Sequence, residues 1–249
     1  MVIRARRAVV GGVETAVCVG VTGERITSVT PYDEPPAATT TVTLEDDEVL
    51  LPGLVDTHVH VNEPGRTEWE GFASATAAAA AGGVTTILDM PLNSVPPTTT
   101  LDGLEAKRAV AQGQVSVDVG FWGGAVPGNL TVLGPLHEAG VFGFKCFLLD
   151  SGVEEFGHLE PEQFALAMDE TARLGALMIV HAEDGELLDD AALDGPHYAG
   201  FLASRPVEAE ESAIGLVLDE AFRSGGRVHV VHLSDASARV VLDPPQGGS

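Results

Sequence analysis

The segment VLLPGLVDTHVH, residues 49–60, marks the point where the chain changes its sequence pattern. It is a short apolar run with a Pro-Gly turn and polar side chains at its end, which is typical of a buried strand. After it, apolar runs typical of strands alternate with amphipathic runs typical of helices, and this rhythm predicts parallel βαβ units. We expect strands at 49–60, 84–90, 115–123, 141–149, 176–183 and 227–234, and helices at 68–82, 101–113, 130–139, 161–174 and 208–224.

Units of this kind build either an open, doubly wound α/β sheet or a (β/α)8 TIM barrel. Polar residues gather at the C-terminal ends of most of the expected strands, which is where barrel enzymes keep their chemistry. No glycine-rich phosphate-binding fingerprint follows the first of these strands, which disfavours a dinucleotide-binding fold. We therefore expect an α/β protein with a TIM barrel that is incomplete in this chain, at about six βα units.

Residues 1–50 have a different pattern, with alternating valine and threonine, paired glycines and a turn-like stretch at 31–36. This pattern predicts several short strands, and we interpret 1–50 as the N-terminal part of a β-sandwich and 51–249 as the barrel domain. The basic and then apolar N-terminus has some features of a signal peptide, but Glu14 and the glycines interrupt its apolar run. No apolar run approaches the ~20 residues that cross a bilayer, so we expect a cytoplasmic protein.

The charged residues and the cysteines exclude several classes of protein. The formal net charge is −24, which disfavours binding to nucleic acid or to an anionic membrane. Cys18 and Cys146 lie far apart and fit no metal or redox spacing, so a reducing compartment is the simpler assumption. Lysine is scarce, because only Lys107 and Lys145 occur among the 13 basic residues. The position of each lysine is therefore informative about function.

Histidines recur where the expected strands end. His58 and His60 close the first barrel strand, and their spacing of two places both side chains on the same side of it. An HxH pair alone is weak evidence, and a hydrogen-bonded surface pair is the alternative. However, His181 and His232 end two further apolar strands in the same way. Because neutral imidazole is a favoured ligand of zinc and neighbouring divalent ions, the four histidines are candidate metal ligands.

Lys145 lies within the apolar stretch FGFKCF, residues 142–147, where an unpaired ammonium group is costly. A lysine that extends its amine to solvent is the alternative interpretation. Burial would lower the pKa of the amine and favour its neutral form. A neutral amine can add carbon dioxide, and the resulting carbamate presents two oxygens to two metal ions.

Several motifs occur in an order that is similar to that of a known family. They are PGLVDTHVHVNEPGRTEWEGF at 52–72, GGVTTILDMPLN at 82–93, GFKCFL at 143–148, HAED at 181–184 and VHLSDAS at 231–237. Together they resemble the cyclic amidohydrolases, the group that contains the dihydroorotases, hydantoinases and allantoinases, and the resemblance extends to about Ala238. The stretch that begins at Asn62 most resembles the allantoinases. Dihydroorotases typically have a carboxylate-binding arginine at this position, and allantoin has no carboxylate.

The resemblance implies a function and a site. The HxH pair would bind the more buried of two divalent metal ions, and His181 with His232 would bind the second. A carboxylated Lys145 would bridge the two ions, which we expect to be zinc, with manganese or cobalt as alternatives. The bridged metals would activate water to open the ring of allantoin, giving allantoate in purine breakdown. The family also implies a homo-oligomer, a tetramer in its full-length members.

Two further residues are expected near this site. Asn93, after the second barrel strand, matches a position that contacts substrate in relatives, although a turn residue before two prolines is an equal alternative. Asp235 follows His232 by three residues, and a helix cap is the favoured interpretation for it.

The family uses an aspartate at the end of the eighth barrel strand as a ligand and proton shuttle, and we expect that aspartate to be missing. The chain ends after the sixth expected strand with VVLDPPQGGS, and Asp243 there is too close to His232 for this role. We therefore expect a truncated chain with little activity of its own. A hydantoinase-like or dihydropyrimidinase-like enzyme is one alternative, and a catalytically inactive paralogue or fragment is the other.

Overall fold

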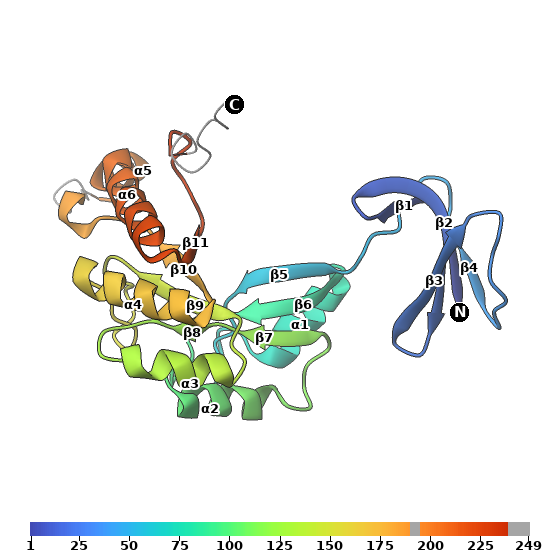
Figure 1. The fold of residues 1–249 in the computed structure, drawn as a ribbon, viewed down its shortest axis with the longest axis horizontal. Coiled ribbons are helices and arrows are strands. Elements are labelled where there is room, and N and C mark those ends of the chain that lie inside the picture. Colours follow the sequence, from blue (N-terminus) through green and yellow to red (C-terminus); the bar gives the residue numbers. More distant parts are fainter. Residues whose placement is uncertain (190–194, 239–249) are drawn as a thin grey trace. The chain divides into compact units, whose positions relative to one another are not determined.

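The computed structural model describes residues 1–189 and 195–238, and Asp243 lies outside this part of the chain. The chain divides into two compact units, Met1–Leu54 and Val55–Ser249 (Figure 1). Among the described residues, no helix has the length and apolar character needed to span a membrane.

The first unit is a four-stranded sheet in the order β3-β2-β1-β4. Strand β1 pairs with β2 in antiparallel and with β4 in parallel orientation. Gly11 and Gly12 have positive φ angles of 58° and 82°, a conformation that lets the chain reverse tightly between β1 and β2. The prediction that this sheet is part of a β-sandwich stays a prediction. The strands are β1 Val2–Val10, β2 Val13–Thr22, β3 Arg25–Pro31 and β4 Thr41–Thr43.

The second unit contains the parallel strands that the sequence pattern predicts. They form the sheets β5-β6-β7 and β8-β9-β10-β11. A single residue, Trp122, separates β7 from β8, and its backbone N–H donates to Asp89 O of β6 at 3.0 Å, so the two sheets follow one another without a break in the layer. The strands are β5 Leu54–Val59, β6 Val84–Asp89, β7 Asp118–Phe121, β8 Gly123–Gly124, β9 Gly143–Phe147, β10 Leu177–His181 and β11 Arg227–Val230.

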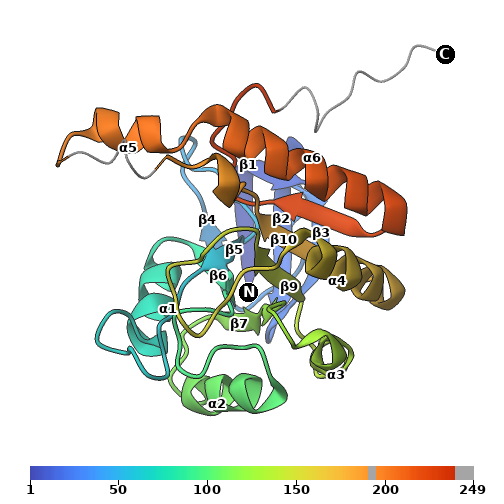
Figure 2. The ribbon, with the colours of Figure 1, turned by 90° about the vertical axis from the view of Figure 1, so that its left-hand side faces the viewer.

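Helices cover the outer side of these strands in an arc, which is the arrangement of an incomplete TIM barrel (Figure 2). Each main helix turns an apolar face inward, and the buried side chains there include Leu104, Leu136, Phe164 and Val217. The expected fold class is confirmed. The helical elements are α1 Phe72–Ala81, α2 Leu101–Ala111, η1 Leu130–Val132, α3 Leu133–Glu138, α4 Pro161–Leu174, η2 Gly185–Leu187, α5 Tyr198–Ser204 and α6 Val207–Ser224.

Two of the helices differ from the sequence prediction. Helix α1 begins at Phe72 rather than at 68, because residues 62–70 form a closed loop in which Asn62 N–H donates to Glu70 O at 2.9 Å. Glu63 Oε2 then accepts from Phe72 N at 2.9 Å and satisfies the first free donor of the helix. Helix α5 was not predicted, although Tyr198, Phe201 and Leu202 have the i, i+3, i+4 spacing of one helix face. In the structure these three side chains are exposed.

Candidate metal centre

The four candidate histidines lie together at the carboxyl ends of their strands. The ring centroids of His58 and His60 are 5.5 Å apart. His232 follows β11, and its ring centroid lies 5.5 Å from that of His58 and 4.7 Å from that of His181. Strands β5 and β11 are at opposite ends of the strand succession, so the short distance between His58 and His232 shows that the layer curves until its two ends face one another.

Lys145 occupies the centre of β9, whose five residues are all buried. The side chain is 1% exposed, and Nζ lies 4.7 Å from the centroid of the Phe147 ring, which in turn stacks on His181 at 4.9 Å. Within residues 1–189 and 195–238, no carboxylate forms an ion pair with this amine. Burial lowers the pKa of Lys145 to about 8.

The histidines are held in their neutral form, which is the form that binds metal. Burial is the main cause in all four cases, and it lowers the pKa of His60 and of His232 to about 4. The pKa values of His58 and His181 are also lowered. The positive charge of Lys145 contributes to each of these shifts, so the amine lies near the four rings.

His181 has a second polar neighbour. Its Nε2 atom lies 3.2 Å from Glu183 Oε2, and the same oxygen accepts from Arg205 Nη1 at 2.5 Å. Glu183 thus links the end of β10 to the residue that follows α5. Its carboxylate opposes the lowering of the His181 pKa by burial.

Asn93 lies against His60. Its side-chain amide nitrogen is 3.3 Å from His60 Nδ1. The residue has a positive φ of 75°, and its carbonyl oxygen accepts from Arg66 Nη1 at 2.9 Å. Asparagine tolerates this left-handed conformation better than most residues. Contact of Asn93 with a substrate stays a prediction, but its position beside a candidate ligand is a feature of the structure.

A cleft of about 500 Å³ opens beside the histidines. Its wall includes His181, His232, Tyr198 and Asp235. The carboxylate of Asp235 accepts from the backbone N–H of Ser237 at 2.9 Å and of Ala238 at 3.0 Å. Asp235 therefore caps the turn at 236–238, whereas the helix cap that the sequence pattern favours stays a prediction.

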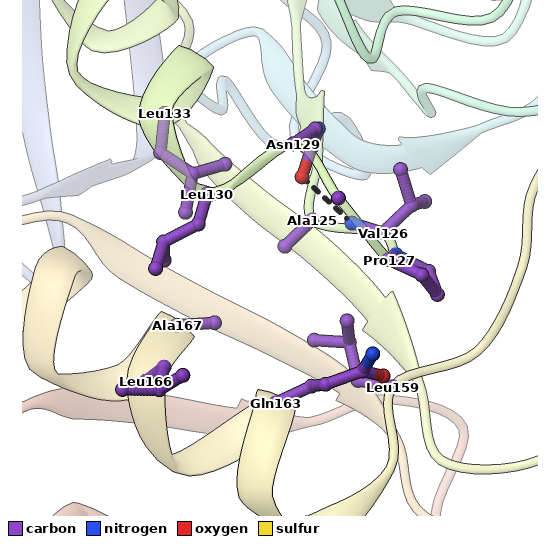
Figure 3. Close-up of a pocket in the computed structure, with 11 residues that line it drawn as sticks. Ala125, Val126, Pro127, Asn129, Leu130, Leu133, Leu159, Gln163, Leu166 and Ala167 are labelled. Carbon is purple, nitrogen blue, oxygen red and sulfur yellow. Dashed lines mark hydrogen bonds between the residues drawn. The ribbon is translucent and has the colours of Figure 1, made fainter.

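A smaller cavity of about 130 Å³ lies away from the candidate ligands, between the residues after β8 and the start of α4 (Figure 3). Asn129 Oδ1 accepts from Val126 N at 3.0 Å on one side of it. The opposite wall is mainly apolar and includes Leu159, Leu166 and Ala167. None of the candidate site residues lines this cavity.

The structure contains a buried ion pair that the sequence analysis missed. Lys107 Nζ of α2 lies 2.7 Å from Asp89 Oδ2 at the end of β6, and both side chains are fully buried. The sequence gives one signal for this pair, which is the scarcity of lysine. In the structure both lysines of the chain are buried in the second unit.

Among the described residues, no three His, Cys, Asp or Glu side chains are placed to hold a single metal ion. The four imidazoles instead form a continuous series of neighbouring rings, in the order His60, His58, His232 and His181.

Several known proteins are similar to this chain in sequence. Residues 49–237 match the amidohydrolase family. The allantoinase of Streptomyces avermitilis is 55% identical over 242 residues, which cover 96% of this chain and 54% of that protein. The allantoinase of Saccharomyces cerevisiae is 50% identical over 195 residues, which cover 76% of this chain and 42% of that protein.

Among solved structures, an L-hydantoinase (dihydropyrimidinase) from Arthrobacter aurescens is similar to this chain with a TM-score of 0.88 and 29% identity, covering 96% of this chain and 54% of that one. The chain spans about half the length of the curated relatives it matches. These matches confirm the resemblance inferred from the motifs: this chain belongs to the amidohydrolase family.

Proposed function

We propose that this chain contributes the histidines and the lysine of an active site that hydrolyses a cyclic amide, and that the substrate is allantoin, opened to allantoate. One observation carries the proposal. Four neutral imidazoles from the ends of β5, β10 and β11 lie next to one another, and the nearby buried amine of Lys145 has no acidic partner among the described residues. The name allantoinase, which the two curated relatives described above share, supports the choice of substrate.

Members of the amidohydrolase family generally bind divalent metal ions, and the residues present fit such ions. We propose two ions, zinc first and manganese or cobalt as alternatives, with two imidazoles for each. In such a centre each ion would have two imidazoles and the shared, carboxylated Lys145 as ligands. It would therefore not require three His, Cys, Asp or Glu side chains around one ion. When bound, such a pair of ions would lower the pKa of a water molecule toward ~7 and polarise an amide carbonyl.

The chain's own residues prepare this site in three ways. Burial keeps the imidazoles neutral, so their lone pairs are free at pH 7. The lowered pKa of Lys145 makes its amine available for reaction with carbon dioxide. Asn93 limits the rotation of His60 through the contact at Nδ1. Asp235 is engaged by two backbone amides, so we assign it no proton transfer.

The proposed preference for allantoin rests on Asn62 as well as on the relatives. Asn62 is 8% exposed and lies two residues after His60, at the position of the carboxylate-binding arginine of dihydroorotases. A neutral side chain there offers no charge partner to a buried substrate carboxylate, which is strongly disfavoured without one. The similarity to L-hydantoinase makes a hydantoin or dihydropyrimidine the second candidate substrate.

Metal analysis tests the proposal most directly. The protein is loaded with zinc, manganese or cobalt in bicarbonate, desalted, and its metal content is measured beside that of Lys145→Ala. We expect up to two ions per chain in the wild type and a large loss in the variant. Ring opening of allantoin, dihydroorotate and hydantoin is then assayed in a protein whose barrel is restored or completed in trans. Equal metal content in the two proteins, or preference for dihydroorotate, would contradict the proposal.

Two further proposals concern the setting of the enzyme. We propose a homo-oligomer, a tetramer for the whole protein, and mass measurement in solution tests this. We also propose that the protein works in the cytoplasm, because Cys18 and Cys146 are both free and buried, in different units of the chain. Fractionation of the source cells tests the location.

A further inference from the structure

The backbone on either side of the two β5 histidines is tied to neighbouring elements. Thr57 O accepts from the indole N–H of Trp122 at 2.9 Å. Val59 O accepts from Met90 N at 2.8 Å. Val61 N donates to Asp89 Oδ1 at 2.7 Å. His58 and His60 are therefore each flanked by residues whose backbone has a specific partner.

The third of these ties differs from the other two, because it depends on a buried carboxylate. Lys107 Nζ reaches that carboxylate from α2 at 2.7 Å and also donates to Met90 O at 2.8 Å. Met90 is the residue whose N–H holds Val59. The ammonium group thus binds both residues of the β6 end that hold the end of β5.

A buried ion pair is a poor way to stabilise a fold. Removing two charges from water costs several kcal/mol for each ion, and well-packed apolar pairs of similar volume often serve as well or better. The cost is visible here, because burial raises the pKa of Asp89 to about 6 even with Lys107 beside it. The ion pair forms directed hydrogen bonds to Val61 N and Met90 O, which an apolar pair cannot form.

We propose that the buried Asp89–Lys107 pair is a positioning device that holds the carboxyl end of β5 so that His58 and His60 present their rings to the metal. Both side chains are fully buried, and we assign neither of them contact with the ion or the substrate. The pair acts through the backbone of Val61 and Met90. The inference rests on the proposed function only in taking these histidines as metal ligands.

The test removes both charges together. In Asp89→Leu/Lys107→Met no buried charge is left without a partner, so the fold is retained while the bonds to Val61 and Met90 are lost. Two controls match it. Glu170→Leu/Arg173→Met removes an exposed ion pair of α4 whose closest N–O distance is also 2.7 Å. Met168→Ala opens the buried core under α4 and lowers stability at a residue that lies outside β5, β6 and α2.

Four quantities are measured on each protein. They are the melting temperature, the affinity for Co²⁺ by competition with a chelating dye, the absorption spectrum of the bound Co²⁺, and the hydrogen exchange rate of the Val61 amide. We expect the double variant to melt within a few degrees of the wild type. We also expect it to bind the metal ~10–100-fold more weakly, with an altered Co²⁺ spectrum and faster exchange at Val61. The α4 pair variant should match the wild type, and Met168→Ala should lose stability but keep the spectrum.

A double variant with wild-type metal affinity, spectrum and Val61 exchange overturns the proposal. So does a loss of affinity that Met168→Ala reproduces at equal melting temperature, because that loss is a general effect of instability. Failure of the proposed function is a separate result, in which the wild type itself binds no Co²⁺. In that case the Val61 exchange still decides whether the pair holds the end of β5.

Discussion

Replacing Lys145 by methionine tests two effects of this residue separately: its effect on the free energy of unfolding and its contribution to metal binding. The side chain is 1% exposed, and no carboxylate pairs with it in the described part of the chain. Burial lowers its pKa from 10.5 to about 8. At about 1.4 kcal/mol per pKa unit, the buried ammonium costs about 3 kcal/mol of unfolding free energy.

Methionine keeps the unbranched chain, and a substitution that conserves volume costs less than ~1.5 kcal/mol. We therefore expect metal-free Lys145→Met to be about 2 kcal/mol more stable than the metal-free wild type at pH 7. The cost is fully present there, since pH 7 lies below both pKa values, and it fades as the pH rises from about 8 to 10.5. The stability gain should shrink over the same range.

The assay is urea unfolding of chelator-treated protein, followed by metal analysis after reloading. The expected result is a variant that is more stable and binds much less metal. Lys107→Met is the matched control, because it makes the same change at the only other lysine. It should lose about 3–5 kcal/mol, since it leaves the buried Asp89 carboxylate without a partner. The reasoning is refuted if Lys145→Met destabilises the metal-free protein or retains its metal.

Four other predictions follow from the site and the sheet. His58→Ala should lose at least ~10-fold in metal affinity, whereas His158→Ala, whose ring lies 3.3 Å from Glu160 at a partly exposed position, should keep it; competition titration measures both. In a protein whose barrel is restored or completed in trans, allantoin should be opened far faster than dihydroorotate, and Asn62→Arg should narrow the difference in kcat/KM between the two substrates. The folded pKa of Asp89, about 6, lies above its unfolded value of 3.8. Between these pKa values the native state binds more protons than the unfolded state, so the free energy of unfolding should fall as the pH rises from about 4 to 6. Urea titrations at several pH values measure this fall, and Asp89→Leu/Lys107→Met should abolish it. Finally, β5 and β11 are each the last strand in the order of their described sheet. The 249-residue chain should therefore self-associate through these edge strands, and a strictly monomeric mass in light scattering would contradict this.

Much of the barrel could be predicted because local signals and tertiary packing agree there. Helix α4 has the predicted bounds, since Pro161 opens it and Gly175, with a φ of 67°, closes it. The histidines could be found for a related reason: the carboxyl ends of parallel strands meet on one side of the layer, so residues far apart in sequence converge there. Their spacing and the apolar runs before them are properties of the chain alone.

Other features were decided only when the elements packed together. Helix α1 starts late because Glu63 and the closed loop at 62–70 occupy its expected first turn. Asn93 faces His60, and Lys107 reaches Asp89 across the space between α2 and β6, through contacts that no local pattern encodes. Hydrophobic periodicity and turn residues act over a few positions along the chain. The burial of a charge and the identity of its partner depend on which surfaces close over it, and for this protein only the tertiary structure decides that.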